Sequence, residues 1–168
     1  MSAAIDGQLQ LPGRWSPVRA SARAPRLADN VVPIVTDTES PAETEAVGAE
    51  VAGRLRPGDV VLVSGELGSG KTTFVRGACR ALGVTGAVTS PTFNIGQRYR
   101  GRVAVSHLDL YRLEHPEEED PALLDEYLSG DSVVFVEWPG RADPGVGAVT
   151  ARVRIEHRGG DRRRVTVA

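Results

Sequence analysis

The chain has 168 residues, a formal net charge of −2, 40% hydrophobic residues and 25% charged residues. This length is enough for one domain with a hydrophobic core, and the near-neutral charge gives no global signature of nucleic-acid or membrane binding. The only cysteine, Cys79, cannot form an internal disulfide, which favours a reducing, cytoplasmic location. The sequence contains no run of 18 apolar residues and no basic-then-apolar start, so neither a membrane span nor a secretory signal is predicted.

Residues 1–30 are predicted to form a disordered tail, in front of a single domain at residues 31–168. The tail contains three prolines, shows no hydrophobic periodicity and has more arginine than acidic residues. A targeting peptide is the alternative interpretation, although no clear amphipathic helix supports it.

The first strand is expected at residues 31–35, where Pro33 favours an edge position. A helix should begin after Ser40, because Ser40 can cap it, Pro41 suits its first position and Glu43 completes a capping box. Apolar side chains then follow at helical spacing at Val47, Val51 and Leu55.

A phosphate-binding loop is predicted at residues 65–72. The sequence there is Gly65-Glu66-Leu67-Gly68-Ser69-Gly70-Lys71-Thr72, which fits the pattern G-x-x-x-x-G-K-[ST]. An apolar strand at residues 60–63 precedes it, and an amphipathic helix that ends at Gly83 follows it, as the motif requires. The glycines allow backbone N–H groups to approach phosphates, and the helix N-terminus adds partial positive charge.

Three side chains of this motif have expected roles in nucleotide binding. Lys71 should reach the β- and γ-phosphates, Thr72 should bind Mg²⁺, and Thr73 should lie beside the α-phosphate. Lys71 is also the only lysine among the 20 basic residues of the chain. A guanine-reading N/T-K-x-D element would need another lysine, so the sequence excludes a typical GTPase and favours a small ATPase or phosphotransferase.

A switch-like threonine is the next candidate. In P-loop proteins, the segment after the first helix often senses the γ-phosphate, and Thr92 stands there in the sequence Ser90-Pro91-Thr92-Phe93. The alternative is an ordinary loop that leads to a strand.

Two further strands are expected to end in carboxylates. Residues 103–109 end at Asp109, and residues 132–137 end at Glu137, which has the position of a Walker-B acid, where aspartate is more usual. Ligands of open α/β sheets bind beyond the carboxyl ends of the strands, so both acids are site candidates. His107 is expected to pack or hydrogen-bond beside the sheet, and Trp138 either packs or lies partly exposed at the site.

The C-terminal part is predicted to be a β-hairpin, after a short amphipathic helix near residues 123–128. Apolar residues alternate through residues 149–157 and again at Val165 and Val167, with a Gly-Gly-Asp turn between them. The outward face of the hairpin, a solvated surface or a phosphate or RNA contact, is expected to carry Arg152, Arg154, Arg158, Arg162, Arg163 and Arg164.

Four motifs together resemble the TsaE family, the ATPases of bacterial tRNA threonylcarbamoyladenosine biosynthesis. The resemblance covers roughly residues 34–167 and implies an α/β, P-loop NTPase-like fold, with a mostly parallel central sheet flanked by helices and a C-terminal antiparallel β-hairpin. The motifs are Gly65 to Phe74, Ser90-Pro91-Thr92-Phe93, His107-Leu108-Asp109-Leu110-Tyr111-Arg112-Leu113 and Val136-Glu137-Trp138-Pro139.

The resemblance also implies a reaction and partners. Family members use ATP and Mg²⁺ and act with the TsaD–TsaB complex, which modifies the adenosine next to the anticodon of tRNAs that read ANN codons. The ATPase itself does not form the threonylcarbamoyl bond. It is expected to hydrolyse ATP weakly alone, to be coupled to its protein partners and to meet tRNA indirectly, through the complex.

Site residues carry over by position. Lys71 matches the phosphate lysine, Asp109 the essential aspartate and Thr92 the switch-like threonine, while Thr72 and Glu137 match the Mg²⁺ ligands. Asp109 as base and Glu137 as metal ligand is the preferred assignment, and the reverse remains open. The resemblance assigns nucleotide contacts to Glu66, Leu67, Gly68, Ser69, Gly70, Lys71, Thr72, Thr73 and Arg163. The long N-terminal tail and the acidic residues 117–120 depart from the family pattern.

Two other functions remain possible on the sequence alone. A small P-loop metabolite kinase would need a substrate lid, and no arginine-rich lid stands out between Arg112 and Ser132. A nucleotide-gated binding subunit would keep ATP binding without requiring hydrolysis.

Overall fold

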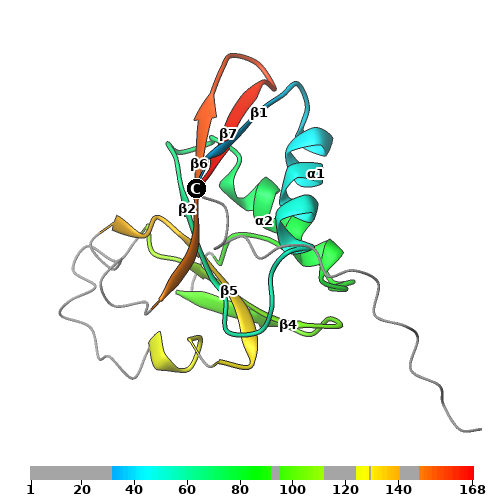
Figure 1. Ribbon diagram of the computed structural model, residues 1–168, viewed down its shortest axis with the longest axis vertical. Coiled ribbons are helices and arrows are strands. Elements are labelled where there is room, and N and C mark those ends of the chain that lie inside the picture. Colours follow the sequence, from blue (N-terminus) through cyan, green and yellow to red (C-terminus); the bar gives the residue numbers. More distant parts are fainter. Residues whose placement is uncertain (1–31, 92–94, 112–123, 129, 141–147) are drawn as a thin grey trace, which may run out of the picture.

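The computed structural model describes residues 32–91, 95–111, 124–128, 130–140 and 148–168. Within these ranges, seven strands form one mixed sheet in the order β1-β7-β6-β2-β5-β4-β3, with two helices packed against it (Figure 1). The elements in chain order are β1 (Ile34–Thr38), α1 (Pro41–Ala52), β2 (Val60–Ser64), α2 (Lys71–Ala81), β3 (Gly96–Tyr99), β4 (Ala104–Asp109), β5 (Ser132–Glu137), β6 (Val149–His157) and β7 (Arg163–Val167).

The centre of the sheet is parallel and its two sides are antiparallel. Strand β2 pairs in parallel with β5 and β6, and β4 pairs in parallel with β5. Antiparallel pairing joins β6 to β7, β7 to β1, and β3 to β4. This confirms the predicted α/β class with a mostly parallel centre and a C-terminal antiparallel hairpin.

Helices α1 and α2 lie side by side on one face of the sheet (Figure 1). They bury the larger hydrophobic core there, which includes Phe74 and Val75 of α2 and Phe135 of β5, all 0% exposed. The opposite face carries a smaller core around Leu108 and Val136, against which residues 124–128 pack. Among the described residues, the two helices therefore cover the face of the sheet toward which Val105 and Phe135 point, together with the residues that alternate with them along the same strands.

The start of α1 and the end of α2 are capped by the residues that the sequence predicts. The Ser40 hydroxyl accepts a hydrogen bond from the Glu43 N–H at 3.2 Å, and the Glu43 carboxylate accepts one from the Glu39 N–H at 2.9 Å, one residue before the usual capping-box partner. After α2, Gly83 has φ +90°, and the Val84 N–H bonds back to the Cys79 carbonyl at 3.0 Å. These are the features of a glycine-terminated helix.

Three parts of the fold differ from expectation. Strand β1 begins after Pro33 and is shifted from residues 31–35 to 34–38, although it is an edge strand as predicted. Strand β3 was not predicted, because Gly96-Gln97-Arg98-Tyr99 has no alternating apolar pattern. The predicted short helix appears as one turn, in which the Leu128 N–H donates to the Leu124 carbonyl at 3.0 Å. The predicted tail at residues 1–30 lies outside the described residues.

No helix in the described ranges is both long enough and apolar enough to cross a bilayer.

Candidate functional site

The loop between β2 and α2 has the backbone that its glycines allow. Gly65 and Gly70 have φ values of +148° and +102°, which L-residues with a Cβ rarely adopt. A Cβ on Gly65 would also lie 2.3 Å from the Ile155 carbonyl oxygen of β6, so this glycine is required by close packing as well. The loop is thus held against β6 while its far side stays clear, since a Cβ on Gly68 would meet nothing within 4 Å.

The N-terminus of α2 faces this loop. Gly70 is the N-cap and supplies no side-chain hydrogen bond, so the first N–H groups of α2, which include those of Thr72 and Thr73, are not capped by a side chain. Together with the helix dipole, this makes the loop an anion-binding site. Leu67, in the middle of the loop, is 75% exposed.

Lys71 extends across the mouth of the loop. Its Nζ donates to the carbonyls of Gly65 at 3.0 Å and Glu66 at 2.8 Å, and it lies 3.8 Å from the centroid of the Trp138 ring. Burial lowers the pKa of the Lys71 ammonium, while the charges of Glu137 and Asp109 oppose this shift. The positive charge is therefore held by carbonyl dipoles, an aromatic face and two nearby carboxylates.

Glu137 lies at the end of β5 and is only 2% exposed. Its Oε1 accepts a hydrogen bond from the Thr72 hydroxyl at 2.9 Å and is 2.8 Å from Nε2 of His107. Thr72 lies in the first turn of α2 and His107 lies on β4, so three elements meet at this carboxylate. The sequence analysis expected His107 to pack or hydrogen-bond beside the sheet, and the structure shows that its partner is the Walker-B-like acid.

Asp109 pairs with Glu137 in the register of β4 and β5, which places both acids at the same end of neighbouring parallel strands. Its surroundings are more open than those of Glu137, with intermediate burial. The Ser90 hydroxyl donates to one carboxylate oxygen of Asp109, and the Tyr111 N–H donates to the other at 3.1 Å. Ser90 was not among the predicted site residues, although it belongs to the same motif as Thr92, which lies outside the described residues.

The Thr72–Glu137 pair has the right chemistry for Mg²⁺. This ion takes oxygen ligands and is commonly held by one or two protein groups together with phosphates and water. Among the described residues, no cluster of three or more His, Cys, Asp or Glu residues could form an all-protein cage for a metal. A hydroxyl and a carboxylate beside a phosphate-binding loop match the sparser kind of site.

Arg163 reaches the loop from β7. Its Nε donates to the Ser69 carbonyl at 2.8 Å, and one terminal nitrogen lies 3.4 Å from the Gly68 carbonyl. The prediction that Arg163 belongs to the outward face of the hairpin is therefore wrong. It has the parity of Val165 and Val167, which are buried under the helices, so its side chain extends over the loop.

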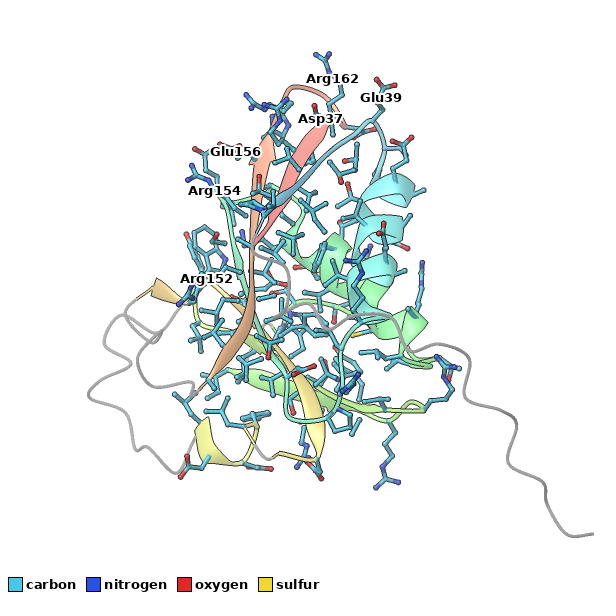
Figure 2. The ribbon with its side chains drawn as sticks, in the orientation of Figure 1. Asp37, Glu39, Arg152, Arg154, Glu156 and Arg162 are labelled. Carbon is cyan, nitrogen blue, oxygen red and sulfur yellow. The ribbon has the colours of Figure 1, made fainter. Side chains whose placement is uncertain are left out.

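A cavity of about 410 Å³ lies beside Arg163. The far end of the hairpin and the segment from β1 to α1 form its walls, and Figure 2 shows Arg162, Asp37 and Glu39 gathered there. Its lining residues are Asp37, Thr38, Glu39, Arg158, Arg162, Arg163 and Arg164.

Two of the other hairpin arginines lie on the predicted outward face. Arg152 and Arg154 extend from β6 on the side away from the helices (Figure 2). Acidic side chains pair with several arginines of this surface: Glu156 lies 3.4 Å from Arg154, and Asp37 accepts two hydrogen bonds from Arg164 at 2.7 and 2.8 Å. The Arg164 guanidinium also lowers the pKa of Asp37. The surface is thus a partly neutralised basic patch.

The comparisons with known proteins agree on one family. The family model described as threonylcarbamoyl adenosine biosynthesis protein TsaE matches residues 38–165. Among curated relatives named tRNA threonylcarbamoyladenosine biosynthesis protein TsaE, that of Bacillus subtilis is 38% identical over 130 residues, covering 77% of this chain and 81% of the relative. The Treponema pallidum relative is 33% identical, covering 78% of this chain and 97% of the relative. The crystal structure of YdiB from Bacillus subtilis superposes with a TM-score of 0.68 at 33% identity, covering 81% of this chain and 84% of that one.

Proposed function

Because the chain belongs to the TsaE family, we propose that it is a Mg²⁺-dependent ATPase of tRNA threonylcarbamoyladenosine biosynthesis. In this proposal it acts with the TsaD–TsaB complex on the adenosine next to the anticodon of tRNAs that read ANN codons. The observation that carries the proposal is the convergence of Lys71, Thr72 and Glu137 at one phosphate-binding loop. The transfer of the threonylcarbamoyl group is left to the partner complex.

The loop residues bind the triphosphate of ATP. Backbone N–H groups from the loop and from the start of α2 donate to phosphate oxygens, and Lys71 moves its ammonium from the loop carbonyls to the β- and γ-phosphates. The adjacent cavity of about 410 Å³ has the size of a ligand site and shares Arg163 with the loop, so we place part of the nucleoside there.

Thr72 and Glu137 hold the metal ion in this proposal. The Thr72 hydroxyl donates its proton to Glu137, which leaves the oxygen lone pairs of Thr72 free to face a cation. Mg²⁺ at this place would neutralise charge that develops on the phosphates during transfer to water.

Asp109 is assigned as the group that orients or deprotonates the attacking water. It is more accessible than Glu137, and hydrogen bonds from the Ser90 hydroxyl and the Tyr111 N–H fix the carboxylate without linking it to Thr72. Glu137, by contrast, is tied to the Thr72 hydroxyl and buried, as suits a metal ligand. This geometry supports the assignment of Asp109 as base and Glu137 as ligand over the reverse.

A partner protein can cover the mouth of the site. Leu67 in the loop and Tyr111 after β4 are large side chains that are 75% and 55% exposed, and the Tyr111 ring lies 4.9 Å from that of Trp138. Exposed apolar groups around a nucleotide site are suited to contact with another protein that responds to its occupancy. In this proposal the chain contacts tRNA indirectly, through the partner complex.

The test is ATP hydrolysis with Mg²⁺, measured with and without purified TsaD–TsaB and tRNA. We expect slow turnover alone, stimulation by the partners, and loss of both in Lys71→Ala. The matched control is Arg54→Ala, a basic residue in the turn after α1 that pairs with Glu50. Unchanged turnover together with no association would contradict the partner proposal, and phosphate transfer to a metabolite without partners would favour a kinase.

A further inference from the structure

His107 is a fully buried side chain that the proposed mechanism does not yet use. It lies on β4, is 0% exposed, and has its Nε2 at 2.8 Å from Oε1 of Glu137. Among the described residues, its other ring nitrogen, Nδ1, is buried without a hydrogen-bond partner. A purely structural position in this core could be filled by an apolar side chain without leaving a buried polar atom unpaired.

The hydrogen bond has only one productive direction. A carboxylate oxygen accepts, so the proton of this hydrogen bond is assigned to Nε2 of the ring, while Nδ1 is buried without a partner among the described residues. The ring therefore makes one directed contact, and that contact is with the proposed metal ligand.

The oxygens of Glu137 are also used unequally. Oε1 accepts from Nε2 of His107 at 2.8 Å and from the Thr72 hydroxyl at 2.9 Å, which occupies both of its lone pairs. Oε2 has the longer contact to the Thr72 hydroxyl, at 3.2 Å. With Oε1 held on two sides, the carboxylate plane is fixed and Oε2 remains as the oxygen that can face a metal ion or a water bound to it.

This arrangement matters more for glutamate than for aspartate. Glutamate has one more rotatable bond between backbone and carboxylate, and its terminal torsion is broad, so an unsupported side chain could turn its oxygens away from the loop. Hydrogen bonds from outside the metal shell orient ligating carboxylates and are commonly worth 10–100-fold in metal affinity or activity.

We propose that His107 is a positioning residue that holds Oε1 of Glu137, so that Oε2 faces the Mg²⁺ bound with ATP. The proposal rests on the proposed function, since it needs a metal at Thr72 and Glu137. It does not make His107 a catalytic residue, because the ring is buried behind the carboxylate and contacts neither nucleotide nor water in this scheme.

The test compares His107→Leu, which removes the donor at similar size, with His107→Gln, whose amide nitrogen can reach the position of Nε2. Binding of a fluorescent ATP analogue, mant-ATP, is titrated with Mg²⁺ and repeated in EDTA. We expect His107→Leu to raise the Mg²⁺ midpoint roughly 10–100-fold, to leave affinity in EDTA unchanged, and to be largely rescued in His107→Gln. A merely structural role would lower affinity equally in both conditions.

If His107→Leu does not fold, His107→Asn replaces it, because the shorter amide reaches only the position of Nδ1. A midpoint raised in His107→Asn and near wild type in His107→Gln supports the proposal, and equal midpoints in the two variants overturn it. If the wild-type chain binds mant-ATP equally with and without Mg²⁺, this result contradicts the metal site and therefore both proposals. A wild-type Mg²⁺ requirement with an unchanged midpoint in His107→Leu overturns the role of His107 alone.

Discussion

Asp109 and Glu137 end neighbouring parallel strands, yet their surroundings differ. Glu137 is 2% exposed and bonded to Thr72 and His107, whereas Asp109 is partly accessible and bonded to Ser90 and to a backbone N–H. A buried, fixed carboxylate suits a metal ligand, and an accessible one suits contact with water.

Substitution of Asp109 separates the two roles. Asp109→Asn keeps the shape of the side chain but cannot take a proton, so we expect turnover with partners to fall by roughly 10²-fold or more. The Mg²⁺ midpoint for mant-ATP binding should stay near that of wild type. Glu137→Gln is the matched comparison and should raise that midpoint. If turnover survives in Asp109→Asn while Mg²⁺ affinity collapses, the two assignments are reversed.

Cys79 gives a second residue-scale prediction. It is 0% exposed on the core side of α2, and burial raises the pKa of its thiol to about 12 from 9.0. Because the thiolate is the reactive form, we expect native alkylation by iodoacetamide at pH 8 to be slower by a factor of roughly 10³ or more than in urea. Mass spectrometry of the alkylated chain measures this ratio, and equal rates in both conditions would show that the thiol is accessible.

At the scale of elements, α1 and α2 approach closely at two glycines. A Cβ on Gly77 of α2 would lie 1.9 Å from the Glu45 carbonyl oxygen, and one on Gly48 of α1 would lie 2.1 Å from the Phe74 carbonyl oxygen. The Glu45 side chain also pairs with Arg76, at 3.3 Å, and with Arg80. This contact sets the position of α2, and therefore of the loop and Thr72 at its N-terminus.

Gly77→Ala should destabilise the fold. Overpacking costs about 1–3 kcal/mol, whereas the gain in helix propensity is at most about 1 kcal/mol, so we expect a lower urea midpoint. Gly86→Ala is the control, because a Cβ there meets nothing within 4 Å and should change stability by no more than about 0.5 kcal/mol. A Gly77→Ala midpoint equal to or above that of Gly86→Ala would contradict the close helix contact.

At the scale of the whole molecule, the C-terminal hairpin completes a site that begins far earlier in the chain. Arg163 of β7 donates to the carbonyls of Ser69 and Gly68, which lie 94 and 95 residues before it. The pairing of β1 with β7 brings Asp37, Thr38 and Glu39 to the same place, where they line the cavity next to Arg163.

Arg163→Lys tests this long-range closure. Lysine keeps the charge but cannot present several N–H groups in a planar fork, so the loop should lose at least one charge-assisted hydrogen bond. Such a bond is worth about 1.5 kcal/mol, so we expect roughly tenfold weaker mant-ATP binding, with faster hydrogen exchange in residues 65–70. Arg54→Lys, in the turn after α1, is the control and should leave both the mant-ATP affinity and the hydrogen exchange unchanged. Equal affinities in the two variants would show that Arg163 does not support the site.

The sequence by itself determined the features that depend on local pattern. The P-loop, the Ser40 cap, the glycine after α2 and the apolar strands β2, β5 and β6 each follow from residues within a few positions of one another. Steric limits, capping hydrogen bonds and side-chain periodicity act over such short distances, so the α/β class and the place of the nucleotide loop were predictable. Thr92 and the tail stay predictions, because they lie outside the described residues.

Only the tertiary structure decided how distant residues meet. Strand pairing joins His107 to Glu137 and forms β3 from a segment without an apolar repeat. The packing of α2 and of the loop after it against the sheet joins Thr72 to Glu137 and brings Ser90 to Asp109. The inward direction of Arg163 could have been inferred from its parity with Val165 and Val167, but all the hairpin arginines were assigned together to the outward face. The side-chain contacts among these join residues 19 to 95 positions apart. The free energy that selects them comes from packing and pairing across the whole sheet.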